Sequence, residues 1–221
     1  MAGSAAPAEP ALVAGPAEVT GADVAVARAR LDGRVRRTPA MRIEAGQLGT
    51  AHPGFWVKLE SLQVTGAFKA RGALNSLLAA QIPRAGVCAA SGGNHGQAVA
   101  WAAGLLGVPA TVFVPTTCPA IKLRRLAGYQ ASVTVTGAVY EESLAAAEHF
   151  AARTGASLIH PFDHPMTVAG AGTAAAEFIE QVPDLDTVLA AVLDGAYLPV
   201  RDEVVGILSC GGNVDITALP L

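Results

Sequence analysis

Charged residues are scarce in this sequence, and long apolar runs are absent. Only 15% of its 221 residues are charged, 52% are apolar, and the net charge at pH 7 is −3. This composition is typical of a globular chain, and it offers no basic footprint for nucleic acid or an anionic membrane. No uninterrupted apolar run is long enough to cross a bilayer. We therefore expect a soluble protein with its own core, and neither nucleic acid nor a membrane as a partner.

Cysteine is also rare. The three cysteines, Cys88, Cys118 and Cys210, are far apart, and no CxxC motif pairs them. An odd number at such spacings argues against a disulfide framework and against a zinc site. The N-terminus lacks a positive segment followed by a long apolar core, which is the pattern of a signal peptide. We therefore expect reduced thiols and a cytoplasmic location.

Metal-ligand patterns are missing as well. His160 and His164 are four residues apart, but a proline follows each and prevents a regular helical face. His52 is expected in a turn and His149 on the surface of a helix. We therefore expect no metal site and interpret these four histidines as structural or solvated.

The first part of the chain predicts a leader, a helix and a strand pair. Residues 1–19 are rich in Ala, Pro and Gly and are expected to form a flexible leader. Thr20 is expected to cap a helix that runs to about Leu31, with Asp23 at the third position of a capping box. Strands at 41–44 and 55–60 would be joined by a turn at 52–54, and an apolar helix at 72–80 would follow.

From Gly86 onward, apolar strands and helices alternate. Strands are expected at 86–91, 109–115, 131–137 and 157–162, and helices at 93–107, 119–127, 140–153 and 166–181. Two further strands are expected at 187–192 and 204–210. Continuous apolar strands between amphipathic helices indicate an α/β fold with open parallel sheets covered by helices on both faces.

Lysine occurs only three times, and one lysine has an unusual setting. Lys69 lies in LESLQVTGAFKARGA (residues 59–73), between Phe68 and Ala70, close to an apolar helix. Enclosure by small and aromatic residues would desolvate the amine, lower its pKa and make it a usable nucleophile or Schiff-base former. The alternative is a surface lysine that opens a helix.

Two glycine-containing motifs follow. In ASGGNHGQ (residues 90–97), glycines allow close backbone approach to a ligand, and Ser91 and Asn94 add side-chain donors at a helix N-terminus that favours anions. It is not GxGxxG, so a dinucleotide site is a poor match. The alternative is a turn that only packs a helix against the sheet. The motif SCGGN (residues 209–213) alone would be a turn.

Together, the three motifs resemble the pyridoxal-phosphate-dependent serine/threonine dehydratase family of the tryptophan-synthase-β fold type, fold type II. The resemblance covers about 31–186 and resumes near 195. It implies that Lys69 holds pyridoxal 5'-phosphate covalently and that Phe68 packs beside its ring. It also implies that Asn94 meets the phenolic oxygen, and that Cys210, or as second choice Ser209, meets the pyridine nitrogen.

The resemblance further implies a reaction. Ser91, Gly92, Asn94 and His95 would bind the carboxylate of a small amino acid. L-Threonine or L-serine would undergo β-elimination to a 2-oxo acid and ammonia. Gly92 stands where racemases of the family carry a serine, so racemisation is disfavoured. A homodimer is expected, as is usual in the family.

One family feature is absent. The family has a run of about four glycines that cups the cofactor phosphate, whereas this sequence nowhere has three consecutive glycines. The family's usual length suggests that roughly a hundred residues are missing between Leu189 and Ala196. The small α/β domain (86–163) would then be intact, and the large cofactor domain (20–85 plus 164–221) incomplete.

The shortened sequence leaves alternatives open. The chain is either a working dehydratase or a catalytically impaired relative with weak or absent cofactor binding that needs a partner to cover exposed core. A third interpretation, a generic α/β nucleotide-binding module, is weaker.

Overall fold

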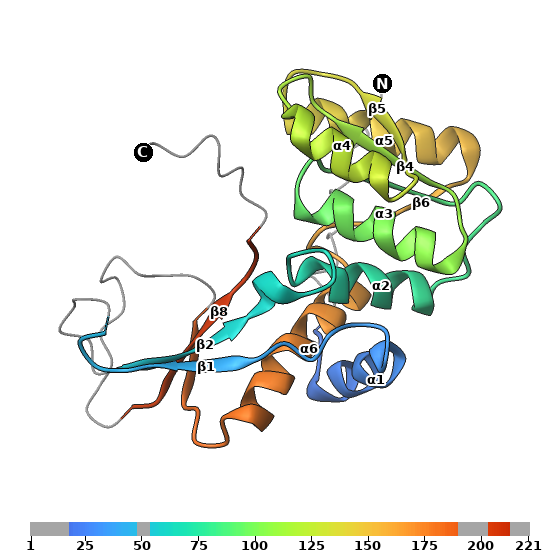
Figure 1. The fold of residues 1–221 in the computed structure, drawn as a ribbon. Coiled ribbons are helices and arrows are strands. Elements are labelled where there is room, and N and C mark those ends of the chain that lie inside the picture. Colours follow the sequence, from blue (N-terminus) through green and yellow to red (C-terminus); the bar gives the residue numbers. More distant parts are fainter. Residues whose placement is uncertain (1–17, 48–53, 190–202, 213–221) are drawn as a thin grey trace, which may run out of the picture.

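Two four-stranded sheets, with helices on and between them, organise the chain. The computed structural model describes residues 18–47, 54–189 and 203–212 (Figure 1). One sheet has the strand order β1-β2-β8-β7 and the other the order β5-β4-β3-β6. Helix α2 lies between the two sheets, and it packs against α3 on one side and α6 on the other (Figure 1).

The element bounds agree with most of the expected ones. The strands are β1 (Ala40–Ile43), β2 (Phe55–Leu59), β3 (Val87–Ala90), β4 (Ala110–Val114), β5 (Ser132–Val135), β6 (Ser157–Leu158), β7 (Thr187–Leu189) and β8 (Val205–Ser209). The helices are α1 (Gly21–Leu31), the short 3-10 helix η1 (Glu60–Leu62), α2 (Lys69–Ala79), α3 (Asn94–Leu106), α4 (Ala120–Gly128), α5 (Tyr140–Thr154) and α6 (Pro165–Gln181).

The sheet formed by β3 to β6 is parallel and has helices on both faces. Along β3, Val87 and Ala89 pack with α3, whereas Cys88 and Ala90 pack with α5. Successive side chains of a strand point to opposite faces, so a continuous apolar strand needs a helix on each side. This confirms the expected fold class. The edge strand β5 is more exposed, because only β4 pairs with it.

The other sheet mixes strand directions. β2 pairs antiparallel with β1 and parallel with β8, and β8 pairs parallel with β7. The expected strand pair at the start of the chain is therefore confirmed. Helix α6 packs closely on this sheet, because a Cβ on Gly206 would lie 2.7 Å from the Phe178 ring. Residues 52 and 53 of the expected turn and 190–192 of the expected strand lie outside the described residues.

Side chains cap the N-termini of two helices. The Thr20 hydroxyl accepts a bond from the Asp23 N–H, and the Asp23 carboxylate accepts one from the Thr20 N–H. This is the expected capping box of α1. At the start of α6, His164 Nδ1 accepts a bond from the Met166 N–H, which gives this histidine a structural role.

Two expected boundaries are wrong. Helix α2 begins at Lys69 rather than Gly72, so the lysine lies in the first turn and not ahead of the helix. The strand expected at 157–162 has only two residues, Ser157 and Leu158. Pro161 has no N–H to donate to a neighbouring strand, which limits any extension.

The sheets are made from separate stretches of the chain. Strands β1, β2, β7 and β8 come from 40–59 and 187–209, and strands β3 to β6 come from 87–158. The division into a large domain (20–85 plus 164–221) and a small domain (86–163) stays a prediction. The proposed deletion point between Leu189 and Ala196 lies almost entirely outside the described residues. None of the helices in the described ranges is long and apolar enough to span a membrane.

The contact between α2 and α6 generates a first prediction. A Cβ on Gly72 would lie 2.7 Å from the Thr167 carbonyl oxygen, so Gly72→Ala must push the two helices apart. Overpacking of this kind costs about 1–3 kcal/mol. We expect a lower denaturant midpoint for Gly72→Ala in urea unfolding followed by circular dichroism.

Gly104→Ala is the matched control. Its Cβ would be 3.5 Å from the Tyr129 carbonyl oxygen, which is an ordinary contact on an exposed face of α3. Alanine is the better helix former by about 1 kcal/mol, so this variant should be neutral or more stable. Equal stability of Gly72→Ala and the unchanged chain would contradict the close helix contact.

Candidate functional site

Backbone hydrogen bonds join the lysine segment to the SCGGN segment. The Phe68 N–H donates to the Cys210 carbonyl at 3.0 Å, and the Gly212 N–H donates to the Gly66 carbonyl at 3.0 Å. Ala67 and Gly211 form an antiparallel bridge between them. Two motifs that are far apart in the sequence therefore form one local structure.

The third motif reaches the same place through Asn94, the first residue of α3. A Cβ on Gly211 would lie 3.0 Å from Asn94 Nδ2 and 2.9 Å from the Ala67 Cβ. The amide of Asn94 thus lies directly against the glycine backbone beside Cys210. All three motifs meet at the ends of β3 and β8, the edge at which ligands bind in open α/β sheets.

Lys69 is half-buried at the centre of this site. Its Nζ donates to the Pro161 carbonyl at 2.7 Å and lies 5.0 Å from the centre of the Phe68 ring. Burial lowers the pKa of the Lys69 amine, and the nearby Cys210 sulfur opposes that shift. A lowered pKa increases the neutral, nucleophilic fraction of the amine. A half-buried amine that donates to a backbone carbonyl does not match an ordinary surface lysine, although Lys69 does open a helix as that alternative expected.

Cys210 supplies an uncharged group beside the lysine. Burial and the negative charge of Glu60 raise the pKa of its thiol, while Lys69 acts in the opposite direction. The thiol donates to the Leu208 carbonyl at 3.4 Å and stays protonated near neutral pH. Ser209 is also half-buried at the end of β8.

The turn before α3 is tightly packed. The Gly93 N–H donates to the Ser91 hydroxyl at 3.1 Å. A Cβ on Gly92 would lie only 2.5 Å from Cys118 Sγ, so this thiol fills the space in which a side chain at position 92 would begin. The sequence did not reveal this role of Cys118, because a lone cysteine in a loop carries no pattern.

His95 anchors the turn instead of presenting its ring to a ligand. It is 4% exposed, and its Nε2 lies 2.9 Å from the Ile159 carbonyl oxygen. A carbonyl only accepts, so Nε2 carries the hydrogen. Burial lowers the pKa of His95 to about 4, with Lys69 and His160 contributing. The ring is neutral near pH 7 and ties α3 to the segment after β6.

A buried ionic network, which the sequence pattern did not predict, lies next to the site. Arg71 donates to both oxygens of Glu60, at 2.7 and 2.8 Å, and its Nη1 is 3.2 Å from Glu177. Lys58 Nζ is 2.5 Å from the same Glu177. A signal was available: Lys58 and Glu60 interrupt an otherwise apolar strand, and Arg71 interrupts an apolar helix.

The remaining polar atoms of the network are also satisfied. Lys58 uses its other donors on the Thr38 carbonyl at 2.6 Å and the Gln181 side chain at 2.8 Å. The Thr38 hydroxyl donates to Glu60 at 2.5 Å. Although burial alone would raise the pKa of Glu177, the hydrogen bond from Lys58 and the charge of Arg71 lower it. Two cations and two anions therefore balance inside the protein.

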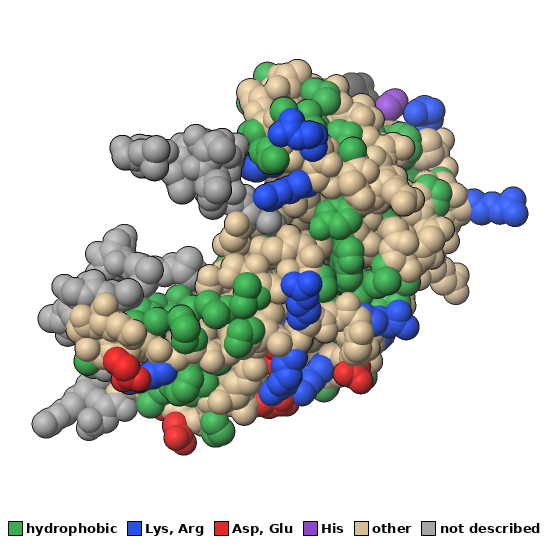
Figure 2. Space-filling view, in the orientation of Figure 1, with side chains coloured by type: hydrophobic (Ala, Val, Ile, Leu, Met, Phe, Trp, Pro, Cys, Tyr) green, Lys and Arg blue, Asp and Glu red, His purple; other side chains and the backbone are tan. Residues whose placement is uncertain are grey.

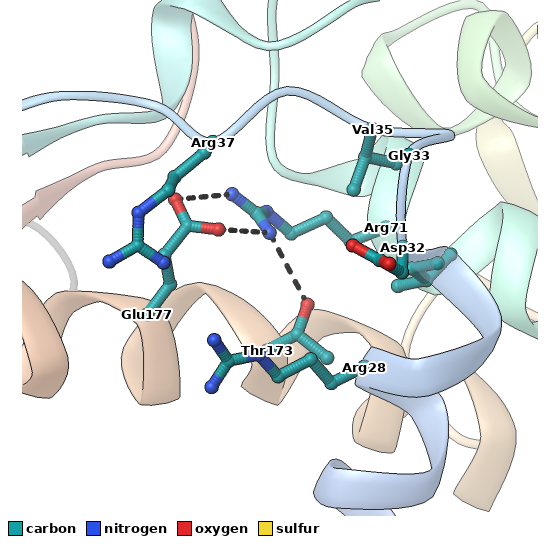
Figure 3. A pocket seen from close by; sticks show the side chains of 9 residues that line it. Arg28, Asp32, Gly33, Val35, Arg37, Arg71, Thr173 and Glu177 are labelled. Carbon is teal, nitrogen blue, oxygen red and sulfur yellow. Dashed lines mark hydrogen bonds and ion pairs between the residues drawn. The ribbon is translucent and has the colours of Figure 1, made fainter.

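A cavity of about 110 Å³ borders this network (Figure 3). Arg28, Arg37 and Arg71 line it, which suggests an anion site. However, Arg28 and Arg37 both pair with Glu180, and Arg71 is occupied by Glu60 and Glu177. Each of these three guanidinium groups already has a carboxylate, so we assign the cavity a structural role.

Comparison with known proteins identifies relatives across most of the chain. The family described as pyridoxal-phosphate dependent enzyme matches residues 31–198. An L-threonine ammonia-lyase of Geobacter sulfurreducens is 41% identical over 173 residues, which are 76% of this chain and 42% of that protein. The chain spans about half or less of the length of the curated relatives it matches.

Solved structures agree with the family match. A threonine deaminase from T.th. superposes with a TM-score of 0.71 at 37% identity, over 78% of this chain and 56% of that one. A pyridoxal 5'-phosphate-dependent aspartate racemase superposes with a TM-score of 0.75 at 37% identity, over 80% and 56% of the two chains. Both lyases and racemases are therefore similar to this chain.

The buried His95 predicts a loss of stability in mild acid. Its pKa is about 4 in the folded protein, below the ordinary 6.5, so the unfolded chain takes up the proton first as the pH falls. Stability should decrease between pH 6.5 and pH 4 by up to about 3 kcal/mol from this residue. Urea unfolding at several pH values across this window measures the decrease.

His95→Gln is the control, because glutamine can donate to the Ile159 carbonyl but does not titrate. The difference in unfolding free energy between the two proteins should change across the window in favour of His95→Gln as the pH falls. Parallel curves for the two proteins would show that His95 is not held neutral by burial.

Proposed function

Because this chain belongs to the pyridoxal-phosphate dependent enzymes, we propose that it is a dehydratase-type protein for L-threonine or L-serine. The reaction would be β-elimination, which yields a 2-oxo acid and ammonia. One observation carries the proposal: Lys69 has a lowered pKa and lies where all three family motifs meet.

The residues around Lys69 fit the ring of pyridoxal 5'-phosphate. Lys69 would hold it covalently, and the Phe68 ring beside Nζ would pack against it. The Asn94 amide, which lies against Gly211, would donate to its phenolic oxygen. Gly211 allows Asn94 to approach the backbone closely, because a side chain there would collide with Asn94 and Ala67.

The cofactor, when bound, supplies an electron sink for a carbanion at the substrate α-carbon. The Lys69 amine would take the α-proton, for which a lowered pKa is suitable. Cys210, or as second choice Ser209, would meet the pyridine nitrogen. A neutral thiol at that position does not hold the nitrogen protonated, which favours elimination over reactions that need a long-lived carbanion.

The turn at 91–95 would bind the substrate carboxylate. The backbone N–H groups of Asn94 and His95 lie in the first turn of α3, where the helix dipole favours an anion, and the N–H of Gly92 lies in the turn just before it. Ser91 would contribute its hydroxyl. Gly92 has no side chain that could act as an acid on the substrate, and a Cβ there would lie 2.5 Å from Cys118 Sγ; this supports elimination rather than racemisation.

The phosphate end of the cofactor has no comparable support. The sequence has no run of three glycines. A phosphate without such a cradle loses several charge-assisted hydrogen bonds. This observation favours a second candidate: a catalytically impaired relative with weak or absent cofactor binding.

Association with a partner belongs to that second candidate. The edge strand β1 leaves Met41 46% exposed, and apolar side chains gather on this part of the surface (Figure 2). Exposed apolar surface promotes association. A homodimer would cover it and is the partner that we propose.

An absorbance titration tests the function directly. Purified protein mixed with pyridoxal 5'-phosphate should develop a visible absorbance band that is lost in Lys69→Ala. Serine or threonine should then change the band and release a 2-oxo acid. The amine of Lys69 is required because it forms the covalent bond to the cofactor.

Lys122→Ala is the matched control, because Lys122 lies in α4, outside the three motifs. This variant should keep the band. A band that is equally strong in Lys69→Ala would refute the proposed role of Lys69. If the unchanged chain folds normally but does not bind pyridoxal 5'-phosphate, the impaired relative is favoured. Binding of pyridoxal 5'-phosphate at the affinity usual for the family would exclude the impaired relative.

A further inference from the structure

Lys69 and Arg71 share the first turn of α2 but point away from each other. Successive residues of an α-helix are rotated by about 100°, so side chains two residues apart leave the helix about 200° apart. Lys69 reaches the Pro161 carbonyl, whereas Arg71 reaches Glu60 and Glu177. The bonds of Arg71 therefore hold the first turn of α2 on the side of the helix opposite to the Lys69 amine.

Every donor of Arg71 is used, and the side chain is almost fully buried. Nε donates to Glu60; Nη1 donates to Glu177 and Thr173; and Nη2 donates to Glu60, Glu177 and the Arg36 carbonyl. Figure 3 shows the bonds to Glu177 and Thr173. Five N–H groups in a rigid fork fix the direction of the guanidinium group. Arg71 therefore acts as a rigid tether on the first turn of α2.

The partners of Arg71 come from the same elements that support Lys69. Glu60 directly follows β2, whose last residue, Leu59, lies opposite Ser209 in β8, and the next residue after Ser209 is Cys210. Glu177 belongs to α6, whose first residue, Pro165, closely follows Pro161. Arg71 thus connects α2 to both the Cys210 side and the Pro161 side of the lysine pocket.

We propose that Arg71, held by Glu60 and Glu177, is a positioning residue that fixes the first turn of α2 so that the Lys69 amine stays enclosed between Phe68, Cys210 and the Pro161 carbonyl. This inference rests on the proposed role of Lys69 as the reactive amine. Arg71 touches none of the groups around Nζ, so it acts through the helix backbone. Lys58 completes the network by neutralising the second charge of the carboxylate pair.

Competitive labelling of the lysines with acetic anhydride across a pH range tests the proposal in the full chain without cofactor. The chain has only three lysines, and Lys122 serves as the internal standard. Among the described residues, Cys210 and His95 interact electrostatically with Lys69, and both remain in every variant; Glu60, whose charge acts on Cys210, is kept in Arg71→Lys. Mass spectrometry of the Lys69 peptide reports the pKa of its amine separately from its accessibility.

The main variant is Glu60→Gln/Arg71→Met, which removes one charge of each sign and leaves the Lys58–Glu177 pair balanced. We expect the Lys69 pKa to rise toward the ordinary 10.5, because the amine gains water when the turn is released. Labelling at pH 8 should slow about tenfold for each unit of that rise. If the double variant does not fold, Arg71→Lys gives the same comparison, since lysine keeps the charge but lacks the fork.

Leu126→Ala controls for lost stability alone. Leu126 is fully buried in the cluster of α3, β4 and α4, away from Lys69, and its truncation should leave the Lys69 pKa unchanged. A folded Arg71 variant with an unchanged Lys69 pKa would overturn the proposal. Failure of the unchanged chain to bind cofactor would refute the proposed function but not this positioning role, because labelling needs no cofactor.

Discussion

The structure depends on the buried pairing of Arg71 and Lys58 with Glu60 and Glu177. These four side chains come from β2, the start of η1, α2 and α6, and they are at most 10% exposed at their side chains. Isolated buried charges are very costly, so each must keep its partner and its hydrogen bonds. The network therefore ties β2, the start of η1 and the first turn of α2 to α6.

The properties of the site depend on the groups that surround the Lys69 amine. Burial lowers the pKa of Lys69, and the nearby Cys210 sulfur opposes that shift without reversing it. The neutral ring of His95 adds no positive charge near pH 7. The enclosing groups come from both ends of the sequence, and backbone bonds between 66–68 and 210–212 hold them together.

The two ends of the family's cofactor, its ring and its phosphate, find unequal support in this chain. The groups that would meet the ring are assembled, whereas the sequence lacks the glycine run that would hold the phosphate. The similar lyases and racemases are much longer than this chain. At Gly92, where a serine is expected in racemases of the family, a Cβ would lie only 2.5 Å from Cys118 Sγ.

By itself, the sequence determined the alternation of strands and helices, the capping box of α1 and the three motifs of the site. These features follow from local periodicity, turn chemistry and residue type, which a short stretch of chain contains. Only the tertiary structure decided that Lys69 is the first residue of α2 and that the His95 ring donates to the Ile159 carbonyl. It also decided that Cys118 packs on Gly92 and that Arg71 pairs with Glu60 and Glu177. Lys58 and Arg71 lie 119 and 106 residues from Glu177, and local pattern carries no information about partners at that distance. Burial, which sets the pKa of each group, exists only once those distant segments have packed together.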